Sequence, residues 1–168
     1  NTRPLKDLTK ESIFNVLQHS KKFSIDFKKS EILDLFCGTG SFGIECLSRE
    51  VKFVTFVENY DGILSILEKN LISLKNISNY KIIKKDILNN FNFNIFKKKF
   101  DIIFLDPPYK EDGLKELIST LISLKILSKN GLVIIHRHKK SEDVFPKSFK
   151  IFEERTYGIS KIIFGTFY

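Results

Sequence analysis

Apolar blocks of strand length alternate with helical patterns along this chain, and this alternation narrows the range of folds more than any other feature. It is typical of a parallel sheet, because each helix returns the chain to the same end of the next strand. Two β-rich runs that meet near Gly158 predict an antiparallel hairpin at a sheet edge. We therefore predict an α/β fold, with strands at residues 31–36, 51–58, 81–86, 100–106 and 131–138, and helices at 9–20, 41–49, 61–75 and 112–127.

Chain length and charge limit the class of protein. A length of 168 residues is typical of one domain, and we predict that residues 1–168 form a single one. No apolar run is long enough to span a bilayer, which favours a soluble cytoplasmic protein. The formal charge of +8 favours a nucleic-acid partner, although 24 of the 28 basic residues are lysine, which a compositional bias would also produce.

The stretch DLFCGTGSFGIE, residues 34–45, contains the pattern G-x-G-x-x-G between a predicted strand and a predicted helix. This position is typical of a nucleotide-binding loop. Asp34 changes the expected ligand, because a carboxylate repels a pyrophosphate and attracts a cation. S-adenosylmethionine, which has an α-ammonium group and a sulfonium but no phosphate, therefore fits better than NAD. We predict that the cofactor is contacted by Asp34, Phe36, Gly38, Thr39 and Gly40.

Two further acidic residues end the next strands. Glu58 closes the second strand and can accept hydrogen bonds from both ribose hydroxyls, with Asn59 beside it. NAD sites also carry an acid here, so this position does not distinguish the two cofactors. Asp86 closes the third strand and can accept from the adenine amine, next to the main chain of Ile87. An ordinary turn at a strand end would also account for Asp86.

The stretch FLDPPY, residues 104–109, ends the fourth predicted strand, where open α/β sheets bind ligands. Its residues suit methyl transfer to an exocyclic amine, a weak nucleophile that has to be held and aimed. Asp106 can accept one N–H of the amine and the Pro107 carbonyl the other, while Pro108 stiffens the turn. Tyr109 offers a ring on which the base can stack. A turn without a catalytic role is the alternative.

The chain resembles the class I S-adenosylmethionine-dependent methyltransferases with a D-P-P-Y motif, and more narrowly the bacterial family of 16S rRNA guanine-N2 methyltransferases called RsmD. The resemblance is carried by RPLKDLTKESIFNVL, DLFCGTGSFGIECLSR, FVE, FLDPPY and the closing YG. It implies a Rossmann-like, mostly parallel seven-stranded sheet flanked by helices, and methylation of a guanine N2 amine in 16S rRNA with release of S-adenosylhomocysteine. It also implies that Arg3 and Asp7 lie near the mouth of the site.

Three further expectations concern RNA, metals and the oligomeric state. We predict that Arg3 and Lys6 contact RNA, that no metal takes part, and that the protein is a monomer. The basic segment that precedes the R-P motif in the family has no counterpart in this sequence. Cys37, in the glycine loop, is predicted to be a small buried residue rather than a nucleophile, because methyl transfer to an amine needs no covalent step.

A basic cluster ends the fifth predicted strand: His136, Arg137 and His138, followed by two lysines. We predict that it contacts RNA phosphates, because this end of the sheet is the ligand-binding edge. A solvated strand end is the alternative. Too few potential ligands gather here to predict a metal site.

Other functions share parts of this pattern. An NAD-dependent oxidoreductase would use the glycine loop and Glu58, but it does not account for Asp34 or the D-P-P-Y turn. A non-catalytic ribosome-assembly factor would keep the fold and the basic face without needing Asp106 and Tyr109. Methylation of DNA adenine N6 or another exocyclic amine would use the same turn, usually with a target-recognition segment for which this chain has no room.

Overall fold

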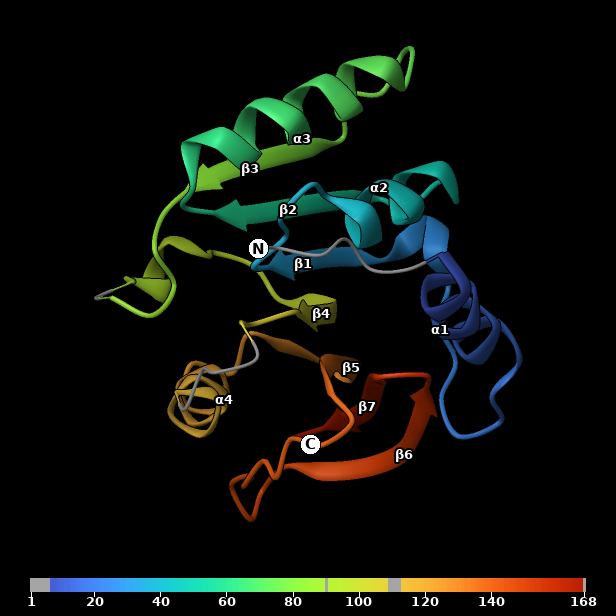
Figure 1. Cartoon of the computed structure of the whole chain (residues 1–168), viewed down its shortest axis with the longest axis vertical. Helices are drawn as coiled ribbons and strands as arrows, with labels where there is room; N and C mark the ends of the chain where they lie inside the picture. Colours follow the sequence, from blue (N-terminus) through green and yellow to red (C-terminus); the bar gives the residue numbers. More distant parts are fainter. Residues whose placement is uncertain (1–6, 90, 109–112, 168) are drawn as a thin grey trace.

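The computed structural model describes residues 7–89, 91–108 and 113–167, and their strands form one seven-stranded sheet (Figure 1). The strand order is β3-β2-β1-β4-β5-β7-β6. Strands β1 to β5 pair in parallel, whereas β7 pairs antiparallel with both β5 and β6. The strands are β1 (Glu31–Leu35), β2 (Phe53–Glu58), β3 (Tyr80–Lys84), β4 (Phe100–Leu105), β5 (Leu127–His138), β6 (Lys150–Tyr157) and β7 (Ser160–Thr166).

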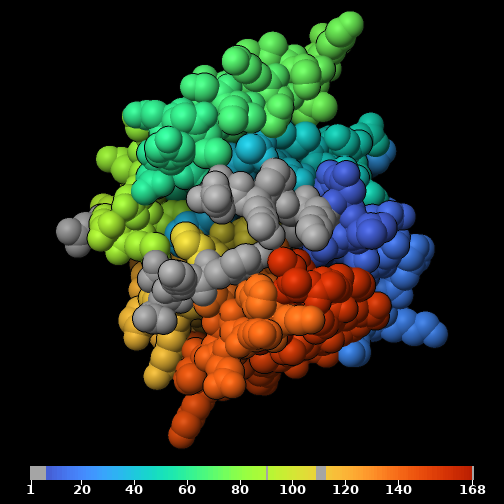
Figure 2. Space-filling view, in the orientation of Figure 1, coloured from blue at the N-terminus to red at the C-terminus, as the bar shows by residue number. Residues whose placement is uncertain are grey.

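The described residues also form four α-helices and two short 3-10 helices, of which α1 and η1 precede β1 and the others connect strands. They are α1 (Asp7–His19), α2 (Ser41–Ser48), α3 (Asp61–Ser73), α4 (Leu114–Ser123), η1 (Phe27–Lys29) and η2 (Phe93–Ile95). Helix α3 and strand β6 lie at opposite ends of the molecule in Figures 1 and 2. Across the described ranges, no helix combines the length and the apolarity that a membrane crossing requires.

The central strands are buried on both faces of the sheet. In β4, Ile102 and Phe104 pack with α1, α2 and α3, whereas Ile103 and Leu105 pack with α4 and η2. Neighbouring residues of a strand point to opposite faces, so each central strand contributes to both hydrophobic layers. This double burial explains why these strands are continuous apolar runs rather than alternating ones.

The structure confirms the predicted mostly parallel α/β sheet with its C-terminal antiparallel hairpin, which turns at Gly158 with a φ of 58°. Most boundaries differ by one or two residues, and the largest difference lies between α4 and β5. The helix predicted to continue to residue 127 ends at Ser123, and β5 already begins at Leu127. Lys125 has a φ of 51°, which no helix residue adopts, and Leu127 pairs with Phe100 of β4. Sheet pairing therefore overrides the helical pattern at this point.

Candidate functional site

The candidate site lies at the carboxyl ends of β1 and β4. From β1 the chain crosses through α2 to β2 on one side, and from β4 it crosses through α4 to β5 on the other. Connections that leave in opposite directions open a crevice at the strand ends, where α/β sheets bind ligands. The two strand ends are in contact, because the Asp106 N–H donates to the Leu35 carbonyl at 3.3 Å.

The glycine loop turns sharply between β1 and α2. Phe36, Gly38 and Gly40 have φ values of 58°, 54° and 83°. Among the described residues, a Cβ at Gly38 would meet no atom within 4 Å, so these residues leave the backbone there open to a ligand. The Thr39 carbonyl accepts a hydrogen bond from Asn70 Nδ2 at 3.1 Å, which ties the loop to α3.

Asp34 lies behind this loop and is 1% exposed. Its Oδ2 accepts from the Gly43 N–H at 2.9 Å, while Oδ1 is buried without a hydrogen-bond partner among the described residues. Burial raises the pKa of the Asp34 carboxyl well above its usual value, and the nearby Asp106 and Glu58 carboxylates raise it further. Three acids therefore gather around the loop, an arrangement that suits a cation and repels a phosphate.

Glu58 is held against the same loop by three main-chain N–H groups. Its Oε2 accepts from Gly38 at 3.0 Å, and its Oε1 accepts from Asn59 at 2.9 Å and Tyr60 at 3.1 Å. A carboxylate has about four lone-pair sites, so hydrogen-bonding capacity remains. Glu58 is half-buried and fixed in orientation, as the predicted contact with a ribose requires.

Asp86 lies in a turn after β3. Its Oδ1 accepts from the Leu88 N–H at 2.9 Å and its Oδ2 from Asn89 Nδ2 at 2.7 Å. The Asn89 hydrogen bond is the main cause that lowers the pKa of this carboxyl, and the Asn59 side chain adds to it. The turn foreseen as an alternative for Asp86 is therefore present, while a role toward adenine stays a prediction. Ile87 beside it is buried.

Both cysteines are buried thiols. Cys37 is 9% exposed and Cys46 is fully buried, and burial raises the pKa of each thiol. A raised pKa disfavours the nucleophilic thiolate. The prediction that Cys37 is a small buried residue in the loop is confirmed.

Asp106 begins the turn after β4, and its side chain starts a chain of hydrogen bonds that runs through His136 to Ser160. Its Oδ1 lies 2.8 Å from His136 Nδ1, and His136 Nε2 lies 2.9 Å from Ser160 Oγ. The Asp106 side chain is 25% exposed, whereas that of His136 is 6% exposed. Ser160 could not be predicted from the sequence, because no local pattern shows that β7 runs beside the end of β5.

Arg137 holds the other end of the same turn. Its Nη1 donates to the Pro108 carbonyl at 3.1 Å, and its Nε donates to Asp143 Oδ1 at 2.9 Å. Arg137 is 3% exposed and His136 is 4% exposed. Their side chains bond to Asp106, Ser160, Asp143 and the Pro108 carbonyl, so both face protein rather than solvent, and the predicted contact with RNA phosphates gains no support from this geometry.

Some of the remaining predicted residues lie within the described ranges and some lie outside them. His138 is half-buried and its Nδ1 accepts from the Lys140 N–H at 3.1 Å, next to the exposed Lys139. Pro107 and Pro108 follow Asp106 directly at the crevice. Tyr109, Arg3 and Lys6 lie outside the described residues.

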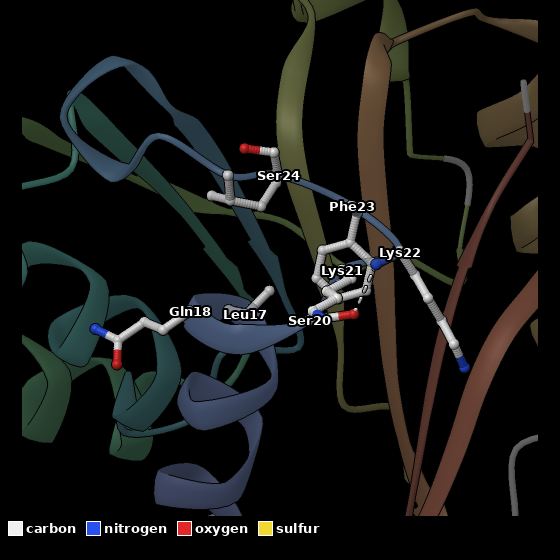
Figure 3. Close-up of a pocket in the computed structure, with 8 residues that line it drawn as sticks. Leu17, Gln18, Ser20, Lys21, Lys22, Phe23 and Ser24 are labelled. Atoms are coloured by element: carbon white, nitrogen blue, oxygen red, sulfur yellow. Dashed lines mark hydrogen bonds between the residues drawn. The ribbon is translucent and has the colours of Figure 1, made fainter.

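A surface hollow elsewhere in the molecule does not belong to this site. Figure 3 shows it beside the end of α1, where residues 17, 18 and 20–25 line it. This segment leads toward the amino end of β1, whereas the glycine loop follows the carboxyl end of β1. In the part of the chain that the structure describes, no group of histidine, cysteine and acidic side chains could hold a metal ion.

Comparison with known proteins relates the chain to a protein family. Residues 1–166 match the family described as "Conserved hypothetical protein 95". The ribosomal RNA small subunit methyltransferase D of Haemophilus influenzae is 33% identical over 162 residues, which cover 94% of this chain and 79% of that protein. A solved structure of a conserved hypothetical protein from Streptococcus pyogenes is 28% identical with a TM-score of 0.77, covering 93% of each chain. The rRNA methyltransferase aviRa from Streptomyces viridochromogenes shares the fold, with a TM-score of 0.71 over 98% of this chain and 87% of its own, at 14% identity.

Proposed function

The chain belongs to the Conserved hypothetical protein 95 family, which includes the small-subunit rRNA methyltransferases D, and from this membership we propose that it uses S-adenosylmethionine to methylate the exocyclic N2 amine of a guanine in 16S rRNA. The observation that carries the proposal is the group of three carboxylates, Asp34, Glu58 and Asp106, around an open glycine loop. When bound, the cofactor supplies an electrophilic methyl group.

Each part of the cofactor has a matching group in the chain. The acidic surroundings of Asp34, with its unpartnered Oδ1, suit the cationic amino acid end. Glu58, fixed by main-chain N–H groups, accepts from the ribose hydroxyls, and Asn59 follows it. The turn at Asp86 and Ile87 borders the adenine. A pyrophosphate would meet the same three acids and be repelled, which argues against NAD.

The turn after β4 orients the acceptor amine. Asp106 accepts one N–H and the Pro107 carbonyl accepts the other, so that the nitrogen lone pair faces the methyl group. Pro108 stiffens the turn, and the Tyr109 ring stacks on the base. With the cofactor bound, the amine nitrogen would accept the methyl group as its bond to sulfur breaks, and the methylated amine would release a proton to solvent. Positioning supplies most of the rate, because the amine is a weak nucleophile.

The RNA contacts are proposed at the mouth of this crevice. The exposed lysines after β5, together with His138, Arg3 and Lys6, would bind phosphates without reading sequence. The substrate is 16S rRNA or a small-subunit particle that contains it, and the protein acts as a monomer in the cytoplasm.

A methyl-transfer assay tests the proposal. Purified protein, labelled S-adenosylmethionine and small-subunit particles from cells that lack this protein should yield N2-methylguanosine in 16S rRNA, identified by mass spectrometry of nucleosides. Particles from wild-type cells, already modified, are the control and should accept no label. Label on adenine N6 when DNA replaces the particles in the assay would favour the amino-methyltransferase alternative, and thermal stabilisation by NAD but not by S-adenosylmethionine would favour an oxidoreductase.

A further inference from the structure

Asp106, His136 and Ser160 form a hydrogen-bonded chain that runs from the crevice into the sheet. The contacts are 2.8 Å from Asp106 Oδ1 to His136 Nδ1 and 2.9 Å from His136 Nε2 to Ser160 Oγ. Exposure falls along the chain, from 25% for the Asp106 side chain to 6% for that of His136, and Ser160 is 5% exposed. The open end of the chain is therefore the carboxylate.

This direction excludes a hydrolytic role for the three residues. In a serine nucleophile site the hydroxyl faces the substrate, while the aspartate is buried and orients the histidine. Here the hydroxyl is the buried end and the aspartate faces the crevice. The order of residues matches a hydrolytic triad, but the group presented to a ligand is Asp106.

The chemistry of the three groups fixes the direction of each hydrogen bond. An ionised Asp106 carboxylate has no proton to donate, so His136 Nδ1 carries the hydrogen. In the neutral ring Nε2 is then the acceptor, and the Ser160 hydroxyl donates to it. Asp106 thus sets the tautomer that points an N–H at its Oδ1, and Ser160 satisfies the other ring nitrogen. Among the described residues this leaves Oδ2 of that carboxylate for a ligand.

Arg137 fixes the other end of the same turn. Its Nη1 donates to the Pro108 carbonyl at 3.1 Å, and the buried Asp143 holds its Nε at 2.9 Å. Neighbouring strand residues point to opposite faces of a sheet, so His136 and Arg137 at the end of β5 contact the turn from both faces.

We propose that His136 is a positioning residue for methyl transfer: with Ser160 behind it, it orients the Asp106 carboxylate toward the acceptor amine. This inference rests on the proposed function, because it assigns His136 a role in the same reaction. His136 acts through Asp106 and touches neither substrate nor cofactor. Loss of the His136 contact should therefore lower kcat, because the amine is less well oriented, and should leave the affinity for the cofactor unchanged.

Two substitutions separate this role from packing. His136→Asn places an amide N–H where Nδ1 lies and keeps the contact with Asp106, whereas His136→Gln places its amide near Nε2 and keeps only the contact with Ser160. With rRNA as substrate, we expect kcat to fall roughly tenfold or more in His136→Gln and about threefold or less in His136→Asn. KM for S-adenosylmethionine should stay within about twofold in both. Equal losses in the two variants, or a loss confined to KM, would overturn the proposal.

A second measurement does not depend on the reaction. Nitrogen NMR of the histidine rings in the wild-type protein should show His136 protonated at Nδ1 and not at Nε2, and this preference should be lost in Asp106→Ala, where the Ser160 hydroxyl can either donate or accept. A ring with its proton on Nε2 in the wild type would overturn the proposal even if the variants fold poorly. If the NMR result is as expected but no guanine N2 methylation occurs, the proposed function fails and the hydrogen-bonded chain stands.

Discussion

At the scale of single residues, Asp34 combines a buried carboxylate with an acidic neighbourhood. Its Oδ2 holds the Gly43 N–H, so replacement by alanine would also remove a structural acceptor. Asp34→Asn keeps an acceptor for that N–H and removes only the charge. We expect it to weaken S-adenosylmethionine binding about 10- to 100-fold, the range for a hydrogen bond to a charged group. Calorimetry that gives wild-type affinity for this variant would contradict the assignment of Asp34 to the cofactor.

The same residue predicts a pH dependence of stability. The pKa of Asp34 is raised in the folded protein, so the unfolded chain loses this proton first as pH rises above about 3.8. The contribution of Asp34 to the free energy of unfolding is therefore largest at low pH and decreases as pH rises toward its folded pKa. Urea unfolding without ligand should show that the free energy of unfolding of the wild type falls, relative to that of Asp34→Asn, as pH increases from about 4. Parallel pH profiles for the two proteins would argue against a raised pKa.

At the scale of elements, the close packing of α2 on the sheet depends on Gly43. A Cβ there would lie 2.3 Å from Phe56 Cε1 and 2.9 Å from Asp34 Oδ2. Gly43→Ala should therefore lower the free energy of unfolding by about 1–3 kcal/mol, despite the better helix propensity of alanine. Gly62 in α3 is the matched control, since a Cβ there would meet only the exposed Tyr60 ring, and Gly62→Ala should be neutral or stabilising. Equal effects of the two substitutions would contradict this packing argument.

Element patterns also explain how far the sequence alone could predict the molecule. Periodicity identified the strands, and the glycine loop and D-P-P turn fall where β1 and β4 end, so the crevice could be predicted. Pairing between distant segments could not. His136 and Arg137 look like a basic surface cluster until β7 is seen to pair beside them, with His136 opposite Ile162 and Arg137 opposite Lys161. The partners Ser160 and Asp143 carry no local signal, which is why the support of the turn was missed.

At the scale of the whole molecule, the formal charge of +8 predicts salt-dependent binding to RNA. Affinity for a 16S rRNA fragment should fall steeply between about 50 and 200 mM salt if several lysines neutralise phosphates. Replacing Lys139 and Lys140 together by alanine should reduce the slope, because these exposed residues follow the carboxyl end of β5, at the same edge of the sheet as the candidate site. The matched control is the exposed pair Lys28 and Lys29 at the far end of β1. A salt response that is flat, or equal in both double variants, would show that the charge is compositional.

The central claim concerns the Asp106 carboxylate, and one comparison of wild type with Asp106→Ala tests it most directly. Cofactor binding and methyl transfer to small-subunit particles would be measured on the same preparations, with the modified nucleoside identified by mass spectrometry. We expect N2-methylguanosine from the wild type. In Asp106→Ala we expect a nearly unchanged cofactor affinity and a kcat reduced roughly 100-fold or more, because the reacting amine is no longer oriented. Wild-type turnover by Asp106→Ala, or a methyl group on a ring carbon or a ribose oxygen, would contradict this claim.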